Sequence, residues 1–202
     1  MSLKGQVVRV IKNLPQTVVY IGQKGLLRSD PDWYIATVVD YILGGGGFQS
    51  RLMDEVREKR GLAYGVYSSV LPLRNGAIYI GNVATKSEAI NESISVIRAQ
   101  LKRMAEEGVS EVELKNAKSY LTGSYPLGFD TNSKIAGQLL FVQTEDLGMD
   151  YFDKRNKLIE AVTMDDIRRV AKRLLKSDGL IITVVGRADQ KQVPVNQKKP
   201  PG

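Results

Sequence analysis

The segment from Leu43 to Ser69, LGGGGFQSRLMDEVREKRGLAYGVYSS, carries the pattern that decides the fold. Its four glycines, Gly44–Gly47, separate two stretches of helical periodicity, which favours a tight connector between two helices. A helix is predicted over about 50–60, because its apolar residues recur at helical spacing and Gly61 is suited to cap its C-terminus. From Ala63 onward, β-branched and aromatic residues predict a strand.

The residues before this segment predict one strand and one helix. The stretch 17–22 is rich in β-branched residues and predicts a strand. Asp30-Pro31-Asp32 is typical of a helix start, with proline at an early helical position. Apolar residues at helical spacing extend this helix to about Leu43, where the glycines are expected to end it.

The residues after it predict a hairpin and a long helix. Strands are expected over about 63–70 and 77–83, and Pro72 and Asn75-Gly76 indicate an antiparallel hairpin whose loop is slightly longer than the minimum. Thr85 and Glu88 fit a capping box that would begin the next helix. The buried face of that helix is marked by Ile90, Ile94, Ile97, Leu101 and Met104.

The remainder of the chain predicts further helices and a final strand. Ser110 and Glu113 fit a second capping box, for a helix that stops before Pro126. Shorter helices are expected near 132–144, 150–161 and 164–175, and Thr163 is suited to cap the last of them. The continuous apolar run 180–185 predicts a strand in the sheet interior. This order indicates an α+β fold, with a mainly antiparallel sheet packed by several helices.

The composition excludes several kinds of catalytic site. The 202 residues include no cysteine and no histidine, and 43% of them are hydrophobic. Without cysteine there is no disulfide framework, thiol nucleophile or thiolate metal site. Without histidine there is no Ser-His-Asp triad, and the usual ligand of catalytic zinc is missing. We therefore expect this chain to bind no metal or other cofactor by itself.

The charge pattern indicates an ordinary solvated surface. The net charge is +7, but no basic stripe with interleaved aromatic residues occurs, so a nucleic-acid partner is not expected. No apolar run approaches the length that spans a bilayer, and a membrane partner is not expected either. Residues 1–6 are interpreted as an expression remnant or leader, 7–186 as one domain, and the polar stretch 187–202 as a disordered tail or crossing arm.

Two carboxylate pairs attract attention as acid–base or metal candidates. Asp165-Asp166 lies at a predicted helix start, and Glu106-Glu107 lies near a predicted helix end. Solvated charge at helix ends explains both pairs better than catalysis does. Gly44–Gly47 is not followed by Lys-Ser/Thr and is therefore not a phosphate-binding loop.

The segment 43–69 resembles the C-terminal half of pitrilysin-type (insulinase-like) zinc peptidases, a family that includes mitochondrial processing peptidase and bacterial two-domain enzymes. Arg-Glu-Lys-Arg-Gly-Leu-Ala-Tyr at 57–64 is its most specific part. The opening segments around Asn13–Thr17 and Arg28–Tyr34, and the closing strand that ends at Val185-Gly186, are also similar. The resemblance covers nearly the whole chain, from about Val7 to Gly186.

The resemblance implies a divided active site. In this family the N-terminal half carries the zinc motif H-x-x-E-H, and the second half lacks it. An Arg and a Tyr of the second half reach toward the zinc site and contact the substrate backbone; the matching residues here are Arg57 and Tyr64. Guanidinium and phenol donors suit a peptide carbonyl and its developing oxyanion. By two-residue alternation, Tyr64 is expected to share a face with Val66, Ser68 and Val70.

The expected partners follow from the same resemblance. They are a zinc-bearing N-terminal half or homologous subunit, a peptide substrate, and a second copy of this chain in a homodimer that imitates the two-half arrangement. The chain would be the substrate-side half of a zinc metalloendopeptidase, inactive alone and soluble in the bacterial cytoplasm or periplasm. The alternative is a structural or regulatory subunit with no role in the chemistry. In processing peptidases a longer glycine-rich loop at the position of Gly44–Gly47 handles substrate, and this chain has only four glycines there.

Overall fold

A computed structural model describes residues 5–187 of the chain. Its elements are β1 (Gln6–Ile11), β2 (Thr17–Lys24), α1 (Trp33–Asp40), η1 (Tyr41–Gly45), η2 (Gly47–Gln49), η3 (Met53–Glu58), β3 (Ala63–Leu73), β4 (Gly76–Thr85), η4 (Ser87–Ala89), α2 (Ile90–Glu107), α3 (Glu111–Gly123), η5 (Tyr125–Phe129), α4 (Asn132–Thr144), α5 (Tyr151–Glu160), α6 (Met164–Leu174) and β5 (Ile181–Gly186). Of the helical segments marked η, η1 and η3 are π-helices and the others are 3-10 helices.

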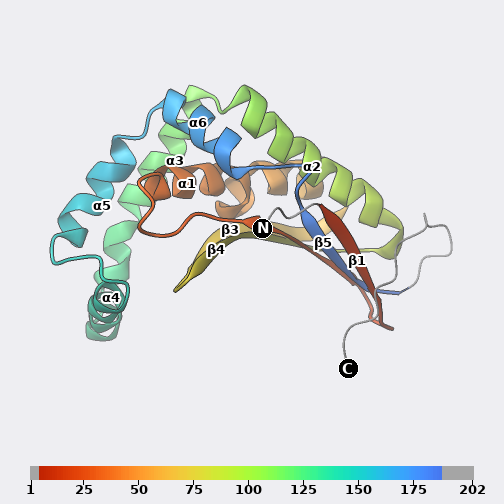
Figure 1. Ribbon diagram of the computed structural model, residues 1–202, viewed down its shortest axis with the longest axis horizontal. Coiled ribbons are helices and arrows are strands. Elements are labelled where there is room, and N and C mark those ends of the chain that lie inside the picture. The colour runs from red at the N-terminus through yellow and green to blue at the C-terminus, as the bar shows by residue number, and fades with distance from the viewer. Residues whose placement is uncertain (1–4, 188–202) are drawn as a thin grey trace.

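The strands form one five-stranded sheet in the order β1-β5-β2-β4-β3. Only the pairing of β1 with β5 is parallel, and the other pairings are antiparallel. The α+β class with a mainly antiparallel sheet is thus confirmed. The sheet curves like an arch, and helices that include α1, α2 and α6 lie over its outer face (Figure 1). The apolar run that predicted an interior strand forms β5, between β1 and β2.

The hydrophobic core lies between the sheet and these helices. The inward residues of β2, such as Val19 and Ile21, are buried and alternate with more exposed neighbours. Across the core, α2 buries the predicted stripe, with Ile97, Leu101 and Met104 at most 1% exposed. Ile94 is partly buried against the same cluster. The 3.6-residue periodicity therefore identified the buried face of this helix correctly.

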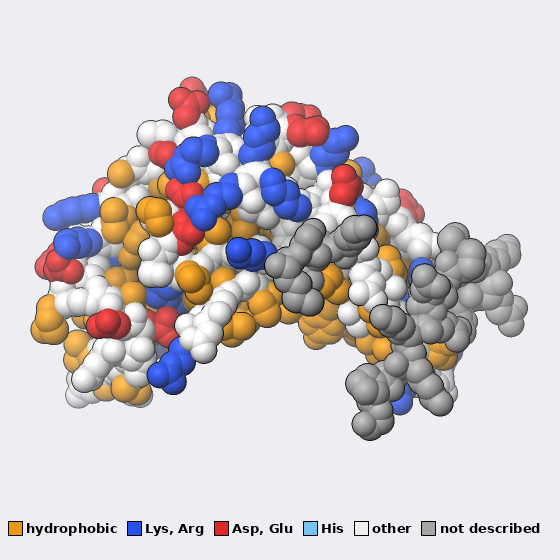
Figure 2. All heavy atoms as spheres, in the orientation of Figure 1, with side chains coloured by type: hydrophobic (Ala, Val, Ile, Leu, Met, Phe, Trp, Pro, Cys, Tyr) orange, Lys and Arg blue, Asp and Glu red, His pale blue; other side chains and the backbone are white. Residues whose placement is uncertain are grey.

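The opposite face of the sheet is open among the described elements. Residues from all five strands line up across it in one row, Val8, Thr183, Tyr20, Asn82 and Tyr67. Tyr20 is 45% exposed and Tyr67 49% exposed. Figure 2 shows charged side chains gathered over the outer, helical side of the arch, whereas hydrophobic side chains are visible along its underside. This underside is a concave surface on which exposed apolar side chains, such as those of Val10, Leu71 and Ile78, lie among polar ones.

The hairpin is tighter and longer than expected. β3 extends to Leu73 and β4 begins at Gly76, so only Arg74 and Asn75 connect them. The prediction of a longer loop was wrong because Pro72 belongs to the strand, where it pairs with Ala77. Proline is tolerated there because β3 is an edge strand of the sheet.

The capping box expected at the start of α2 is absent. Thr85 is the last residue of β4, and its hydroxyl donates a 2.5 Å hydrogen bond to the Leu62 carbonyl. The chain then enters the short η4 turn, and α2 begins at Ile90 without a side-chain cap. The prediction failed because strand pairing, which the local motif does not include, already uses Thr85. The box of Ser110 with Glu113 is confirmed, and so is the cap Thr163, which forms a further box with Asp166.

The first helix does not end before the glycines. α1 continues into the π-helix η1, in which the Gly46 N–H donates to the Tyr41 carbonyl over 2.8 Å. Gly44 is buried there, and a larger residue would not fit, because any Cβ at this position would lie 2.3 Å from Ser68 Oγ. The glycines therefore pack the end of a helix against β3, and the expectation of a simple connector was incomplete.

The ends of the chain are described in part. β1 was not anticipated, and it begins at Gln6, within the stretch 1–6 that we interpreted as a remnant or leader. The boundaries of the domain at 7–186 stay a prediction. The expected tail, 187–202, lies outside the described residues except for Arg187. Within the described part, no helix combines the length and apolarity needed to cross a membrane.

Candidate functional site

Arg57 and Tyr64 are brought together by a direct turn from η3 into β3. Arg57 follows the buried Val56 on η3, and its side chain is 26% exposed. The turn is closed by two 2.9 Å hydrogen bonds, from the Gly61 N–H to the Arg57 carbonyl and from the Leu62 N–H to the Val56 carbonyl. The strand therefore starts immediately beside the helical turn that carries Arg57.

Tyr64 is placed by an irregularity in β3. Ala63 pairs with Thr85 of β4, and Gly65 pairs with the adjacent Ala84. Tyr64 therefore has no partner and forms a bulge. Its side chain is 82% exposed, whereas Val66 is 1% exposed on the inner face. The expected sharing of one face by Tyr64, Val66 and Ser68 was therefore wrong, because the extra residue breaks the two-residue alternation.

The guanidinium of Arg57 packs against two aromatic rings. Its central carbon lies 4.9 Å from the centroid of the Tyr64 ring and 4.5 Å from that of the Phe48 ring. Phe48 is 66% exposed and lies in η2, immediately after the glycine run. Phe48 was not predicted as a site residue, since its only distinguishing sign in the sequence is its position beside the glycines.

The site is cationic and has free donor capacity. Within residues 5–187, the only carboxylate within 4 Å of the Arg57 guanidinium is that of Glu58, at 3.5 Å. A guanidinium presents five N–H donors and a phenol presents one O–H donor. The pair is therefore suited to bind a carbonyl or a negatively charged oxygen at the edge of the open face.

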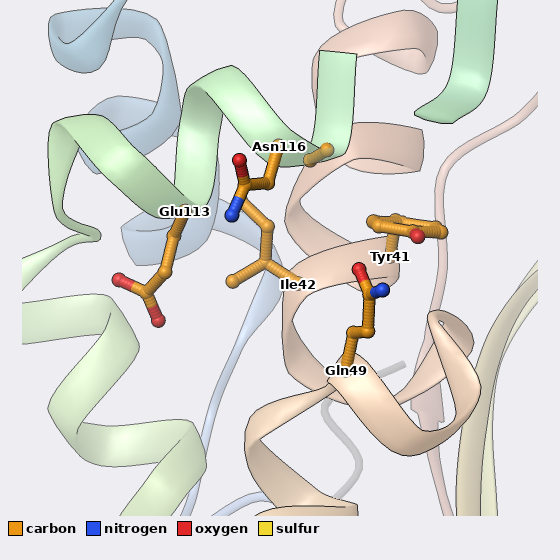
Figure 3. Close-up of a pocket in the computed structure, with 6 residues that line it drawn as sticks. Tyr41, Ile42, Gln49, Glu113 and Asn116 are labelled. Carbon is orange, nitrogen blue, oxygen red and sulfur yellow. The ribbon is translucent and has the colours of Figure 1, made fainter. Parts of the chain in front are cut away.

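A small pocket lies between η1, η2 and α3 (Figure 3). It has a volume of about 210 Å³ and is lined by Tyr41, Ile42, Gln49, Glu113, Asn116 and Ala117. Glu113 is already engaged: partial burial acts to raise its pKa, but hydrogen bonds from Arg51 and Ser110 outweigh this and lower it to about 2. The carboxylate thus caps α3 and holds Arg51, which explains its presence without a ligand.

A buried carboxyl group lies between α1 and β3. Asp40 is 9% exposed and accepts a 2.6 Å hydrogen bond from the Ser68 hydroxyl. Burial raises the pKa of Asp40 to about 6, although the hydrogen bond from Ser68 acts in the opposite direction. Because Asp40 ends α1 and Ser68 belongs to β3, their contact ties the first helix to the strand that carries Tyr64.

Residues 5–187 offer no set of side chains suited to bind zinc. The chain contains no histidine or cysteine, and within the described ranges no group of three Asp or Glu side chains converges as metal ligands would. Both carboxylate pairs have other roles. Asp166 accepts hydrogen bonds from Thr163, and Glu106 and Glu107 each pair with a basic residue one turn earlier on α2.

Comparison with known proteins shows the family of the chain. The family description "Peptidase M16 inactive domain" matches residues 2–121. An uncharacterized zinc protease of Streptomyces coelicolor is 32% identical over 174 residues, which is 85% of this chain and 37% of that protein. A protein of Helicobacter pylori named as a non-peptidase homolog is 33% identical over 123 residues, 60% of this chain and 28% of that protein.

A solved structure resembles the fold closely. The peptidase M16 inactive domain from Pseudomonas fluorescens superposes with a TM-score of 0.85 and 30% identity, over 96% of this chain and 45% of that one. The fold and sequence together define an α+β domain of a peptidase-like protein. The domain itself has no histidine or cysteine to bind zinc. The chain belongs to the peptidase M16 inactive-domain family. It spans less than half the length of the relatives and the structure named here.

Proposed function

We propose that this chain is the substrate-side half, as fragment or subunit, of a zinc-dependent metalloendopeptidase. In this proposal the open sheet face forms one wall of a chamber that holds an extended peptide. Arg57 and Tyr64 contact the peptide near the bond that is cut, and the chain is not catalytic alone. The observation that carries the proposal is the exposed contact of Arg57 with Tyr64 at the edge of this face.

The chemistry of the two side chains supports the assignment. Tyr64 is not needed to fill the core, since it is 82% exposed. The Arg57 side chain is partly buried, 26% exposed, and its guanidinium packs on the exposed rings of Tyr64 and Phe48. A guanidinium and a phenol can both donate to one peptide carbonyl and stabilise the negative charge that develops on its oxygen during cleavage. Such donors are worth most when they are held in place before the substrate arrives.

The zinc in this proposal belongs to a partner half. The lack of histidine and cysteine means that this chain supplies none of the usual nitrogen or sulfur ligands. The names of the zinc-protease relatives and their greater length support a partner that carries the metal. That partner would be the N-terminal half of the same protein or a homologous subunit.

A reconstitution experiment tests the proposal. A zinc-bearing homologous half is assayed alone, with this chain, and with this chain carrying Arg57→Ala, using an unstructured fluorogenic peptide. We expect hydrolysis only when both halves are present, and a large loss with Arg57→Ala. Arg74→Ala, which removes an exposed arginine in the hairpin turn, is the matched control and should leave the rate unchanged. Hydrolysis that does not depend on the chain would contradict the proposal.

The second candidate is a structural or regulatory subunit without a role in the chemistry. The name of the Helicobacter pylori relative, a non-peptidase homolog, favours it. It predicts that the chain assembles with its partner. Arg57→Ala and Tyr64→Phe should then leave the hydrolysis rate of the assembled complex unchanged, although they could weaken assembly. Measuring complex formation by sedimentation beside hydrolysis separates the two candidates.

A homodimer is part of the same proposal. Exposed apolar side chains of the open face, including Val10, Leu71 and Ile78, would be covered by a second copy when no partner half is present. Sedimentation equilibrium of the chain alone should then show a dimer. A strictly monomeric chain at high concentration would contradict the dimer but would leave the peptidase proposal intact.

A further inference from the structure

We propose that Phe48 is a positioning residue that holds the guanidinium of Arg57 in place for substrate. This inference rests on the proposed function, in which Arg57 contacts the peptide. It also assigns a structural purpose to Gly47, namely to place the Phe48 ring on Arg57. The juxtaposition that carries it is the 4.5 Å approach of the guanidinium carbon to the centroid of the Phe48 ring.

The backbone around Phe48 is arranged to present its ring. Gly47 has a φ of 58°, a conformation that side chains disfavour, and it turns the chain sharply just before Phe48. Ser50, which is fully buried, fixes this turn because its N–H donates to the Gly47 carbonyl over 3.0 Å and its hydroxyl over 2.7 Å. Phe48 is therefore carried on an anchored turn.

Core packing does not explain the phenylalanine. Its side chain is 66% exposed, whereas other residues of this segment, such as Leu52 and Met53, are at most 1% exposed. An aromatic ring left in solvent at an anchored turn needs a reason other than hydrophobic burial. The guanidinium of Arg57 lies over this ring, whose face attracts the cation electrostatically.

Two rings together limit where the guanidinium can lie. Arginine has a long side chain whose rotamer freedom must be lost when it binds a substrate. The two rings belong to the elements that precede and follow η3 in the chain, Phe48 to η2 and Tyr64 to β3. Their contacts with the guanidinium reduce this rotamer freedom before substrate binds. Phe48 would then promote hydrolysis through Arg57 without touching the peptide.

A double-mutant cycle in the reconstituted peptidase tests this role. Phe48→Leu should lower kcat/KM about tenfold, mainly through kcat, whereas Phe48→Tyr and Phe48→Trp should stay within about twofold of wild type. In an Arg57→Ala background, Phe48→Leu should cause no further loss, because the group that it positions is gone. Val112→Ala, at a side chain also 66% exposed, is the control for removing exposed apolar surface.

A second readout needs no activity. In the chain alone, the Arg57 Nε–H proton resonance should be shifted upfield by the aromatic rings, and Phe48→Leu should move it downfield while Phe48→Tyr should not. An unchanged resonance and unchanged kcat/KM in Phe48→Leu would overturn the inference. A loss that adds fully to that of Arg57→Ala would also overturn it, since Phe48 would then act on the substrate directly.

The two proposals fail in different ways. If Arg57→Ala leaves hydrolysis intact, the proposed function of Arg57 is wrong, and the resonance shift still decides whether Phe48 holds its side chain. If Arg57→Ala abolishes hydrolysis and Phe48→Leu does not, the proposed function stands and the positioning role is wrong. Circular dichroism of each variant confirms that the fold is intact before either comparison.

Discussion

The ring of Tyr64 lies 4.9 Å from the guanidinium carbon of Arg57, although one residue belongs to a π-helical turn and the other to the bulge of an edge strand. Both features are irregular: the bulge leaves Tyr64 82% exposed, and the π-helical turn carries Arg57, whose side chain is 26% exposed. Bulges and π-helical turns are frequent at functional sites, where they redirect individual side chains. The contact thus depends on two departures from regular secondary structure that meet at one edge of the sheet.

The first prediction separates the Tyr64 hydroxyl from its ring. Tyr64→Phe keeps the ring on Arg57 but removes the donor, and we expect kcat in the reconstituted peptidase to fall by roughly 10²-fold with little change in KM. Tyr120→Phe, which removes a half-exposed hydroxyl on α3, is the control. If Tyr64 only packs against Arg57, Tyr64→Phe will behave like wild type and Tyr64→Ala will not.

The second prediction concerns the buried carboxyl of Asp40. Its pKa is about 6 in the folded state and 3.8 as the ordinary value, so the folded protein binds the proton more tightly. The contribution of this proton to the free energy of unfolding is fully present below about pH 4 and is lost as the pH rises through about 6. Asp40→Asn should remove this dependence. The stability of the variant relative to wild type should rise by roughly 2 kcal/mol between about pH 4.5 and about pH 7.5.

Urea unfolding at both pH values measures this difference, and Asp166→Asn is its control. Hydrogen bonds from Thr163 lower the pKa of Asp166, so its contribution is lost only as the pH falls below the ordinary value of 3.8. The Asp166 variant should therefore be destabilised equally at the two pH values. If the difference in unfolding free energy between Asp40→Asn and wild type does not change with pH, this carboxyl is not the titrating group.

The third prediction concerns the packing of the glycine run against β3. Gly44→Ala should destabilise the protein by about 2 kcal/mol or more, because its Cβ would lie 2.9 Å from the Ser68 backbone nitrogen as well as against the Ser68 hydroxyl. Gly123→Ala, at the end of α3 with no atom within 4 Å of its Cβ, should change stability by less than about 1 kcal/mol. Thermal unfolding of the two variants compares them, and equal stability would mean that η1 is not packed tightly against β3.

The fourth prediction concerns Thr85. Thr85→Val leaves the Leu62 carbonyl without its side-chain donor and should cost about 1 to 2 kcal/mol. The start of α2 should be unaffected, because Thr85 does not cap it. Backbone chemical shifts of Ser87–Ile90 provide the check. Fraying of α2 in this variant would instead favour the capping role that the local motif suggests.

Local motifs predicted much of the fold because their partners are close in sequence. Ser110 with Glu113 and Thr163 form caps within one helical turn, and the stripe on α2 is set by helical periodicity alone. Thr85 and Pro72 were misassigned because their roles depend on β4 pairing and on the exposed edge of β3. The strand Gln6–Ile11 escaped notice because its partner, β5, lies at the other end of the chain.

The candidate site was predictable only in part. The family resemblance identified Arg57 and Tyr64, and the structure brings them into contact. The bulge that exposes Tyr64 arises from the register between β3 and β4, which no local pattern in the sequence encodes. Phe48 and Asp40 were missed for the same reason, because their contacts with Arg57 and Ser68 are tertiary.

The effect of Arg57→Ala on hydrolysis by the reconstituted two-half enzyme tests the central claim most directly. The zinc-bearing half is saturated with wild-type chain or variant, assembly is verified by sedimentation, and kcat/KM is measured on one unstructured peptide. The account predicts a loss of roughly 10²-fold or more with assembly intact, and no loss for Arg74→Ala. An assembled Arg57→Ala complex that retains wild-type kcat/KM would contradict the substrate role assigned to this half.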